Sequence, residues 1–149
     1  MPQASVKRLI DCEKDKLVDL VLDIEKYPEF IPYCLNSKVY EKNKKDNEIH
    51  IIADLTIGKG VFKDTYKSNV EYNVEMDTIY VTNINGPLKY LNNKWIFKNK
   101  NNLTEVSFEV DFELKNRFLN ILMTKSFKYG LDKIADAFQK RAEELFNNR

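Results

Sequence analysis

The stretch that decides the fold is residues 105–114, which read EVSFEVDFEL and are followed almost at once by a long helical pattern. Apolar side chains occupy every second position of this stretch, and acidic or hydroxyl side chains occupy the positions between them. An alternation with a period of two predicts a strand with one buried and one solvated face. This arrangement is typical of an antiparallel sheet with one face on the core.

The helical pattern that follows runs from about residue 117 to residue 146, or about 45 Å at 1.5 Å per residue. Its apolar side chains form one wide stripe, which holds Phe127, Leu131, Ile134, Phe138, Ala142 and Leu145. Residues 118–123, FLNILM, are apolar nearly all round. They predict a separate turn or flexible segment before the main helix, whose closing part would be residues 127–146.

Upstream of residue 105 the same alternation continues back to about residue 35. It predicts strands near residues 35–43, 48–58, 77–84 and 93–99, and one between them that contains Phe62, Tyr66 and Val70. Residues 3–10 predict a first strand, and Leu17, Leu20, Val21 and Ile24 recur at helical spacing. A compact aromatic connector, residues 27–34, contains a second short helix. The order predicts the α+β class, with a curved antiparallel sheet of six to seven strands around the last helix.

The chain has 149 residues, of which 43% are apolar, 12% aromatic and 32% charged, and its net charge is +1. This is enough chain for one domain, residues 1–149, and the composition excludes collagen-like and wholly disordered proteins. The charge favours no nucleic-acid partner, and we expect no DNA binding. Two cysteines without zinc spacing favour reduced thiols and no metal, and the start lacks a signal peptide, so we expect a soluble protein of the cytoplasm.

A sheet that curls around a helix leaves a cavity wherever the helix side chains do not fill the concave face, and such cavities bind apolar ligands. Tyr27, Phe30 and Tyr33 of the connector either plug the open end of the sheet or line a mouth, and both roles are compatible. Asp64 and Ser68 interrupt an apolar strand face. Asp64 lies either at the sheet rim in water, or at a polar end of the cavity that binds a head group beside Tyr66.

Residues 21–34, VLDIEKYPEFIPYC, end with the connector, and they resemble the pattern V-x-D-V-x-x-Y-x-x-F-x-P-W-C of the coenzyme-Q-binding START-domain family. That family belongs to the polyketide-cyclase-like superfamily and has bacterial relatives called ribosome association toxins. Three further stretches carry the resemblance: Asp64-x-Tyr66-x-Ser68-x-Val70, Gly86-Pro87-Leu88 through Trp95-x-Phe97, and Val110-x-Phe112. Tyr33 stands where the eukaryotic pattern has Trp, and Asp64 where it has Glu. The resemblance implies the helix-grip fold.

The resemblance also implies a non-catalytic protein that binds ubiquinone or a related polyprenyl lipid and supports cellular respiration, without a catalytic cofactor. Transient contact with the inner membrane, through residues 118–123, would accompany this role. The candidate ligand-binding residues are Tyr27, Phe30, Pro32, Tyr33, Asp64, Tyr66, Ser68, Val70, Trp95, Phe97, Phe108, Phe112, Phe127, Leu131 and Phe138.

Two other functions remain open. By the same resemblance, the protein would bind the large ribosomal subunit and block subunit association, through basic loops that contain Lys42, Lys44, Lys45, Lys89, Lys94, Lys98 and Lys100. A cyclase-like enzyme would need a general acid or base that reaches the substrate. The alternation places His50, the one histidine, on the outer face of its strand, and Cys34 is expected to be a small buried side chain, so we expect no catalytic residue.

Overall fold

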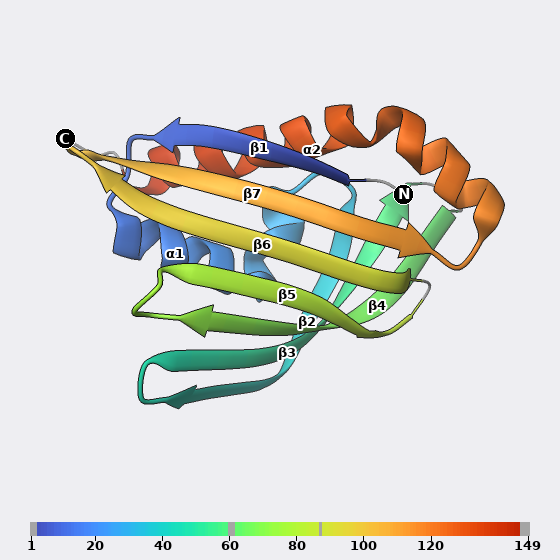
Figure 1. The fold of residues 1–149 in the computed structure, drawn as a ribbon, viewed down its shortest axis with the longest axis horizontal. Helices are drawn as coiled ribbons and strands as arrows, with labels where there is room; N and C mark the ends of the chain where they lie inside the picture. Colours follow the sequence, from blue (N-terminus) through green and yellow to red (C-terminus); the bar gives the residue numbers. More distant parts are fainter. Residues whose placement is uncertain (1–2, 60–61, 87, 147–149) are drawn as a thin grey trace.

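The computed structural model describes residues 3–59, 62–86 and 88–146, with the backbone alone at residues 3, 59, 62, 118–120 and 122–128. The chain starts with strand β1 (Gln3–Ile10), helix α1 (Lys14–Leu22) and the 3₁₀ helix η1 (Ile24–Glu29). Six strands and one long helix follow (Figure 1): β2 (Cys34–Lys45), β3 (Glu48–Lys59), β4 (Phe62–Asn73), β5 (Thr78–Asn85), β6 (Leu88–Lys100), β7 (Leu103–Leu114) and α2 (Arg117–Phe146).

The strands form one antiparallel sheet of seven strands in the order β1-β7-β6-β5-β4-β3-β2. Every strand from β2 to β7 pairs with the next one along the chain, whereas β1 pairs with β7 at the far edge. The predicted α+β helix-grip arrangement is therefore confirmed, with two short helices after the first strand and a long helix at the end. The strands exceed the predicted lengths, because β2 and β3 continue to a two-residue turn at Asp46 and Asn47.

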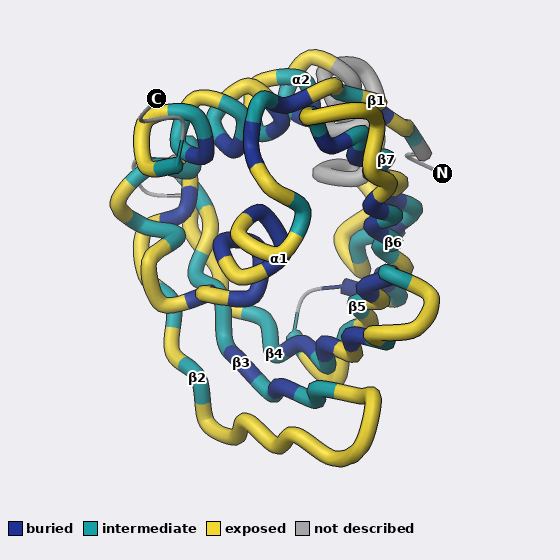
Figure 2. Tube along the Cα trace, turned by 90° about the vertical axis from the view of Figure 1, so that its left-hand side faces the viewer, coloured by how far each residue is buried: buried dark blue, intermediate teal, exposed yellow. Residues whose placement is uncertain are grey.

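Helices α1 and α2 lie on the same side of the sheet, which curves around them. Seen end-on, α1 lies within the curve, and α2 covers the edge formed by β1 and β7 (Figure 2). The buried side chains of the sheet face these helices and pack on Leu17 and Val21 of α1 and on Leu131 and Phe138 of α2. We call this side of the sheet the inner face.

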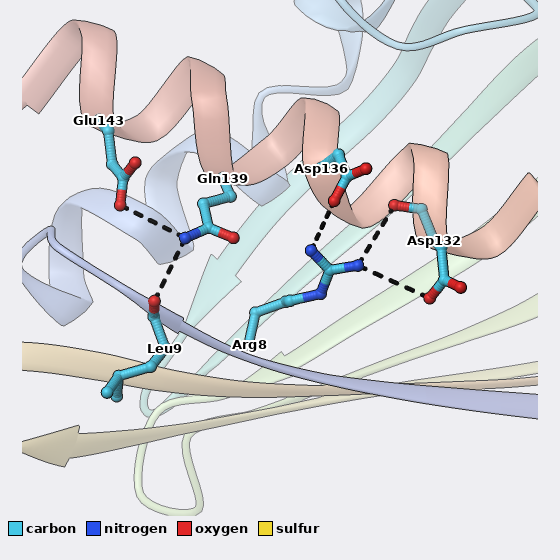
Figure 3. A network of polar contacts seen from close by, with 6 residues as sticks. All are labelled: Arg8, Leu9, Asp132, Asp136, Gln139 and Glu143. Carbon is cyan, nitrogen blue, oxygen red and sulfur yellow. Dashed lines mark hydrogen bonds and ion pairs between the residues drawn. The ribbon is translucent and has the colours of Figure 1, made fainter.

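Polar contacts fix the second half of α2 to β1 (Figure 3). The Arg8 guanidinium forms ion pairs with Asp132, at 3.6 Å, and with Asp136. The Gln139 amide donates a hydrogen bond to the Leu9 carbonyl, at 3.3 Å. Because Arg8 lies on β1 in step with the buried Val6, its charge would be costly on the inner face without these carboxylates.

Helix α2 is continuous from Arg117 to Phe146, so the predicted break around residues 118–123 is wrong. Within α2, no glycine or proline occurs before Gly130, so no residue type there interrupts the backbone hydrogen bonds of the first turns. Leu145, expected on the buried stripe, is 46% exposed, and the half-buried Phe146 follows it.

In the described part of the chain, no helix is long and apolar enough to cross a membrane.

The two ends of the sheet differ. The β2–β3, β4–β5 and β6–β7 turns lie at one end, together with α1, and we call this the α1 end. Lys14 of α1 forms an ion pair with Asp77 of the β4–β5 turn, at 2.8 Å, and the buried Thr104 hydroxyl donates to the Cys12 carbonyl, at 2.7 Å. These contacts close the α1 end. Helix α2 begins at the opposite end, which also holds the segment that joins η1 to β2.

Candidate functional site

Side chains on the inner face form rows across the strands, because paired residues of neighbouring strands lie side by side. The Trp95 row contains Ile49, Tyr72, Ile79, Trp95, Phe108 and Val6. The next row toward the opposite end, the Asn93 row, contains Ile51, Val70, Val81, Asn93, Val110 and Ala4. The Ser68 row follows, with Ala53, Ser68 and Asn83. The inner face is therefore mainly apolar in the Trp95 and Asn93 rows, and it becomes more polar in the Ser68 row.

Several predicted site residues meet in one aromatic cluster, which we define as Tyr27, Phe30, Trp95, Phe97, Phe108 and Phe138. The Phe138 ring of α2 lies at the centre, with its centroid 5.5 Å from Tyr27, 5.3 Å from Phe30 and 5.1 Å from Trp95, all edge to face. The ring centroids of Trp95 and Phe108 lie 4.1 Å apart. The aromatic cluster thus joins η1, α2 and the sheet at the centre of the inner face. The contacts of Phe138 have the edge-to-face geometry that aromatic pairs favour.

The aromatic cluster is packed rather than open. A cavity beneath it, with Trp95, Phe108 and Phe138 among its lining residues, measures about 10 Å³. This volume accommodates one water molecule at most and no part of a prenyl chain. At this point of the fold the rings fill the space between α2 and the sheet. That Trp95, Phe108 and Phe138 contact a ligand stays a prediction.

The polar pair of β4 divides between two environments. Ser68 is buried, and its hydroxyl donates a hydrogen bond to the Ala53 carbonyl, at 3.3 Å. Asp64 is exposed, and its carboxylate accepts a hydrogen bond from the Thr65 amide, at 2.9 Å. Of the two placements considered for Asp64, the structure has the one at the sheet rim. A solvated carboxylate there cannot anchor a head group within the cavity.

Three weakly acidic side chains lie near one another where the connector meets β4. Burial raises the pKa of the Tyr27 hydroxyl, which donates to the Val21 carbonyl, and the neighbouring Tyr66 raises this pKa further. Burial likewise raises the pKa of Tyr66, with a smaller contribution from Cys34. All three groups are neutral at physiological pH. They can donate hydrogen bonds, but they cannot act as general bases.

Burial raises the pKa of the Cys34 thiol from 9.0 to about 11. The neutral thiol therefore stabilises the folded state fully below pH 9, and this contribution is lost as the pH rises toward 11. We predict that the difference in free energy of unfolding between wild type and Cys34→Ala shrinks over this range. Urea denaturation at several pH values measures it. A difference that stays constant from pH 8 to pH 11 would contradict the buried, neutral thiol.

The remaining predicted site residues lie at different depths. Val70, Phe112 and Leu131 are buried in the core, and Pro32 is half-buried. Tyr33 is 50% exposed and has a positive φ of 66°. The side chain of Phe127 lies outside the described part of the structure.

The structure adds two polar residues of the inner face that the sequence analysis missed, Asn83 and Asn93. Asn83 bridges β5 and β6: its amide nitrogen donates to the Leu88 carbonyl, at 3.2 Å, and its oxygen accepts from the Leu91 amide, at 2.9 Å. Asn93 has a buried side-chain oxygen without a hydrogen-bond partner. The alternation that placed Trp95 and Phe97 on one face identifies Asn93 as well, when it is extended two residues toward the start of β6.

The lysines considered for an RNA-binding surface do not form one patch. Lys42, Lys44 and Lys45 are exposed on the β2–β3 hairpin, at the α1 end. Lys89 lies at the start of β6, toward the opposite end, and pairs with Glu113, at 3.6 Å. The Lys94 ammonium lies over the Tyr80 ring, and Lys100 forms an ion pair with Glu105. Lys98 is exposed on β6. Of the seven lysines, the three of the hairpin lie together at one exposed turn.

Other reactive groups are engaged elsewhere. His50 lies on the outer face as predicted, in contact with the Asn69 amide oxygen. Both cysteines are free and buried. Within the described ranges, no three side chains of the His, Cys, Asp and Glu types come together as a metal site.

Comparison with known proteins identifies relatives that match nearly the whole chain. The ribosome association toxin RatA of Rickettsia prowazekii is 30% identical over 141 residues, which cover 93% of this chain and 94% of that protein. The mitochondrial coenzyme Q-binding protein COQ10 of Dictyostelium discoideum is 33% identical over 137 residues, which cover 90% of this chain and 65% of that protein. Both relatives carry the names that the sequence resemblance led us to expect.

The solved structures agree on the fold. An 18 kDa protein from Caulobacter crescentus superimposes with a TM-score of 0.80 at 24% identity, and the match covers 97% of this chain and 98% of that one. A family model described as polyketide cyclase / dehydrase and lipid transport matches residues 12–139. This range begins just before α1, includes the connector and strands β2 to β7, and ends in the second half of α2. The chain therefore belongs to the polyketide cyclase / dehydrase and lipid transport family.

Proposed function

We propose that this protein binds a hydrophobic molecule, ubiquinone or another polyprenyl lipid, between the inner face of the sheet and the first half of α2. Binding, rather than conversion of the molecule, is the proposed role, and the protein would deliver or hold the quinone in support of respiration. The family description and the name of the Dictyostelium discoideum relative support this class of ligand.

The observation that carries the proposal is the continuity of the apolar inner face beyond the aromatic cluster. The cluster and the contacts of Lys14 and Thr104 close the α1 end, so a ligand would enter from the opposite end. Past Trp95, the sheet still presents Val70, Val110 and Phe112. A five-carbon prenyl unit buried against such side chains would contribute about 2–4 kcal/mol before the costs of ordering the tail.

The chemistry of the site favours binding over catalysis. The hydroxyls of Tyr27 and Tyr66 and the thiol of Cys34 have raised pKa values and keep their protons. Asp64 lies at the rim in solvent, and His50 lies on the outer face. A cyclase-like function would need one of these groups to exchange a proton with a bound substrate.

Transient contact with the inner membrane from the cytoplasm would let the ligand enter or leave. The residues that support this placement are Ile121 and Tyr129 on α2, which are 61% and 65% exposed. Large apolar side chains that are exposed to water gain free energy when they move into the boundary between the head groups and the acyl chains of a membrane. Changing both Ile121 and Tyr129 to Ser should slow the transfer of a bound quinone between vesicles. Unchanged transfer would remove membrane contact from the proposal.

The proposal is tested by native mass spectrometry of the purified protein, paired with organic extraction of the same sample. We expect a co-purifying quinone or polyprenyl lipid at up to one molecule per chain. A protein that carries no such molecule, and that takes up none from added quinone, would contradict the proposal.

A second function, binding of the large ribosomal subunit, is favoured by the Rickettsia prowazekii relative and by the exposed lysines of the β2–β3 hairpin. Lysine contacts to RNA phosphates weaken steeply as salt is added. Co-sedimentation with the large subunit across a salt series would detect this binding. If it exists, changing Lys42, Lys44 and Lys45 to Gln should abolish it and leave quinone binding unchanged.

A further inference from the structure

The inner face carries one polar group that its surroundings do not explain, the side-chain amide of Asn93. The side-chain oxygen is buried and has no hydrogen-bond partner in the described structure. The other members of the Asn93 row are aliphatic: Ile51, Val70, Val81, Val110 and Ala4. An unsatisfied carbonyl oxygen in such a place is destabilising, and native proteins keep few of them.

The polar neighbours of Asn93 are already engaged. In the Ser68 row, the Ser68 hydroxyl donates to the Ala53 carbonyl, and both ends of the Asn83 amide bond to the backbone of β6. Two rows toward the α1 end, Arg8 is paired with Asp132 and Asp136. None of these groups is placed to satisfy the Asn93 oxygen.

A bound water is a poor solution at this position. A buried water needs two to four polar partners, and the aliphatic row offers it Asn93 alone. An apolar ligand with a polar head group differs, because burial of its tail supplies the free energy that a water lacks. The Asn93 oxygen accepts a hydrogen bond, so the matching head group must donate one.

We infer that Asn93 is the head-group anchor of the ligand site, and that it selects neutral ligands with an O–H donor, such as a quinol or another phenol with an apolar tail. A charged head group does not fit, because Arg8 is already neutralised and no other cation shares the rows beside Asn93 among the described residues. The reduced form of a quinone carries this donor and the oxidised form does not. The inference rests on the proposed function and adds the chemistry of the head group.

The direct test is a competition between two ligands that differ only in the donor, para-nonylphenol and its methyl ether para-nonylanisole. Native mass spectrometry of the protein with an equimolar mixture gives the ratio of the two complexes. For the wild type we expect the phenol complex to exceed the ether complex by about 3- to 10-fold, as one neutral hydrogen bond provides.

The variant Asn93→Val matches the row and should bind both ligands equally, and it should also melt at a higher temperature than the wild type without ligand. Asn93→Ala provides the same test if the valine variant does not fold. Asn92→Val is the matched control, because Asn92 is exposed on the outer face of the same strand, and it should keep the preference.

The outcomes separate the two claims. Binding of both ligands by the wild type without preference, or a preference that persists in Asn93→Val and Asn93→Ala, overturns the role of Asn93 and leaves the proposed function standing. Failure of the wild type to bind either ligand or ubiquinone overturns the proposed function, and the anchor with it.

Discussion

Replacing Phe138 with Ala is expected to lower the free energy of unfolding by about 3–5 kcal/mol. Phe138 is 3% exposed, and its ring is the one that contacts Tyr27, Phe30 and Trp95 together. Its removal leaves a cavity between η1, α2 and the sheet, which rings held by three different elements cannot fill by small shifts. Urea denaturation followed by circular dichroism measures the loss.

The same substitution at Phe146 is the control. Phe146 is only half-buried, at the end of α2, where the Lys16 ammonium lies over its ring at 5.9 Å. Phe146→Ala should therefore cost less than half as much as Phe138→Ala. Equal losses for the two variants would show that the aromatic cluster is not the packed centre of the fold.

Replacing Gly86 with Ala is expected to destabilise the protein by about 2–4 kcal/mol. Gly86 has a φ of +121°, which side-chain-bearing residues rarely adopt, and a Cβ there would lie 2.8 Å from Cβ and 2.9 Å from Cα of Tyr66. Relief requires the backbone of β4 or of the β5–β6 turn to move. We therefore expect ligand binding to weaken together with stability, because Tyr66 is displaced.

Gly130→Ala is the matched control, with the opposite sign. Gly130 lies within α2, and apart from its own helix backbone no described atom lies within 4 Å of the position its Cβ would take. Alanine is the better helix former, so the variant should gain about 0.5–1 kcal/mol. Chemical denaturation of both variants gives the comparison. A Gly86→Ala variant as stable as the wild type would mean that the turn is free to move away from Tyr66.

Much of the fold could be predicted because strands and helices leave different periods in the sequence. The alternation around Phe108 and Phe112 places these side chains on the inner face, and the helical stripe places Leu131 and Phe138 opposite them. The resemblance of the connector to a known family then supplied the topology. The pairing of β1 with β7 is a contact between distant segments, which no local pattern records.

The candidate site could be predicted only in part, because a period shows which face a side chain takes and not how tightly the face is covered. The periods place Trp95, Phe108 and Phe138 where the sheet faces α2, but they do not show that the three rings pack directly on one another. Asp64 shares the parity of Ser68, yet it lies close enough to the start of β4 to reach solvent. Whether Asn93 is satisfied depends on its neighbours across β5 and β7, and these become known only with the register.

The most direct test of ligand binding uses the single tryptophan of the chain, Trp95, which lies on the inner face beside the Asn93 row. Ubiquinone homologues of increasing tail length are titrated into the protein, and the Trp95 fluorescence is recorded. We predict saturable quenching, with an affinity that rises with each added prenyl unit until the space is filled, and the same behaviour in Asn92→Ala. Quenching that never saturates, and that matches the collisional quenching of free tryptophan at every tail length, would contradict an internal quinone site.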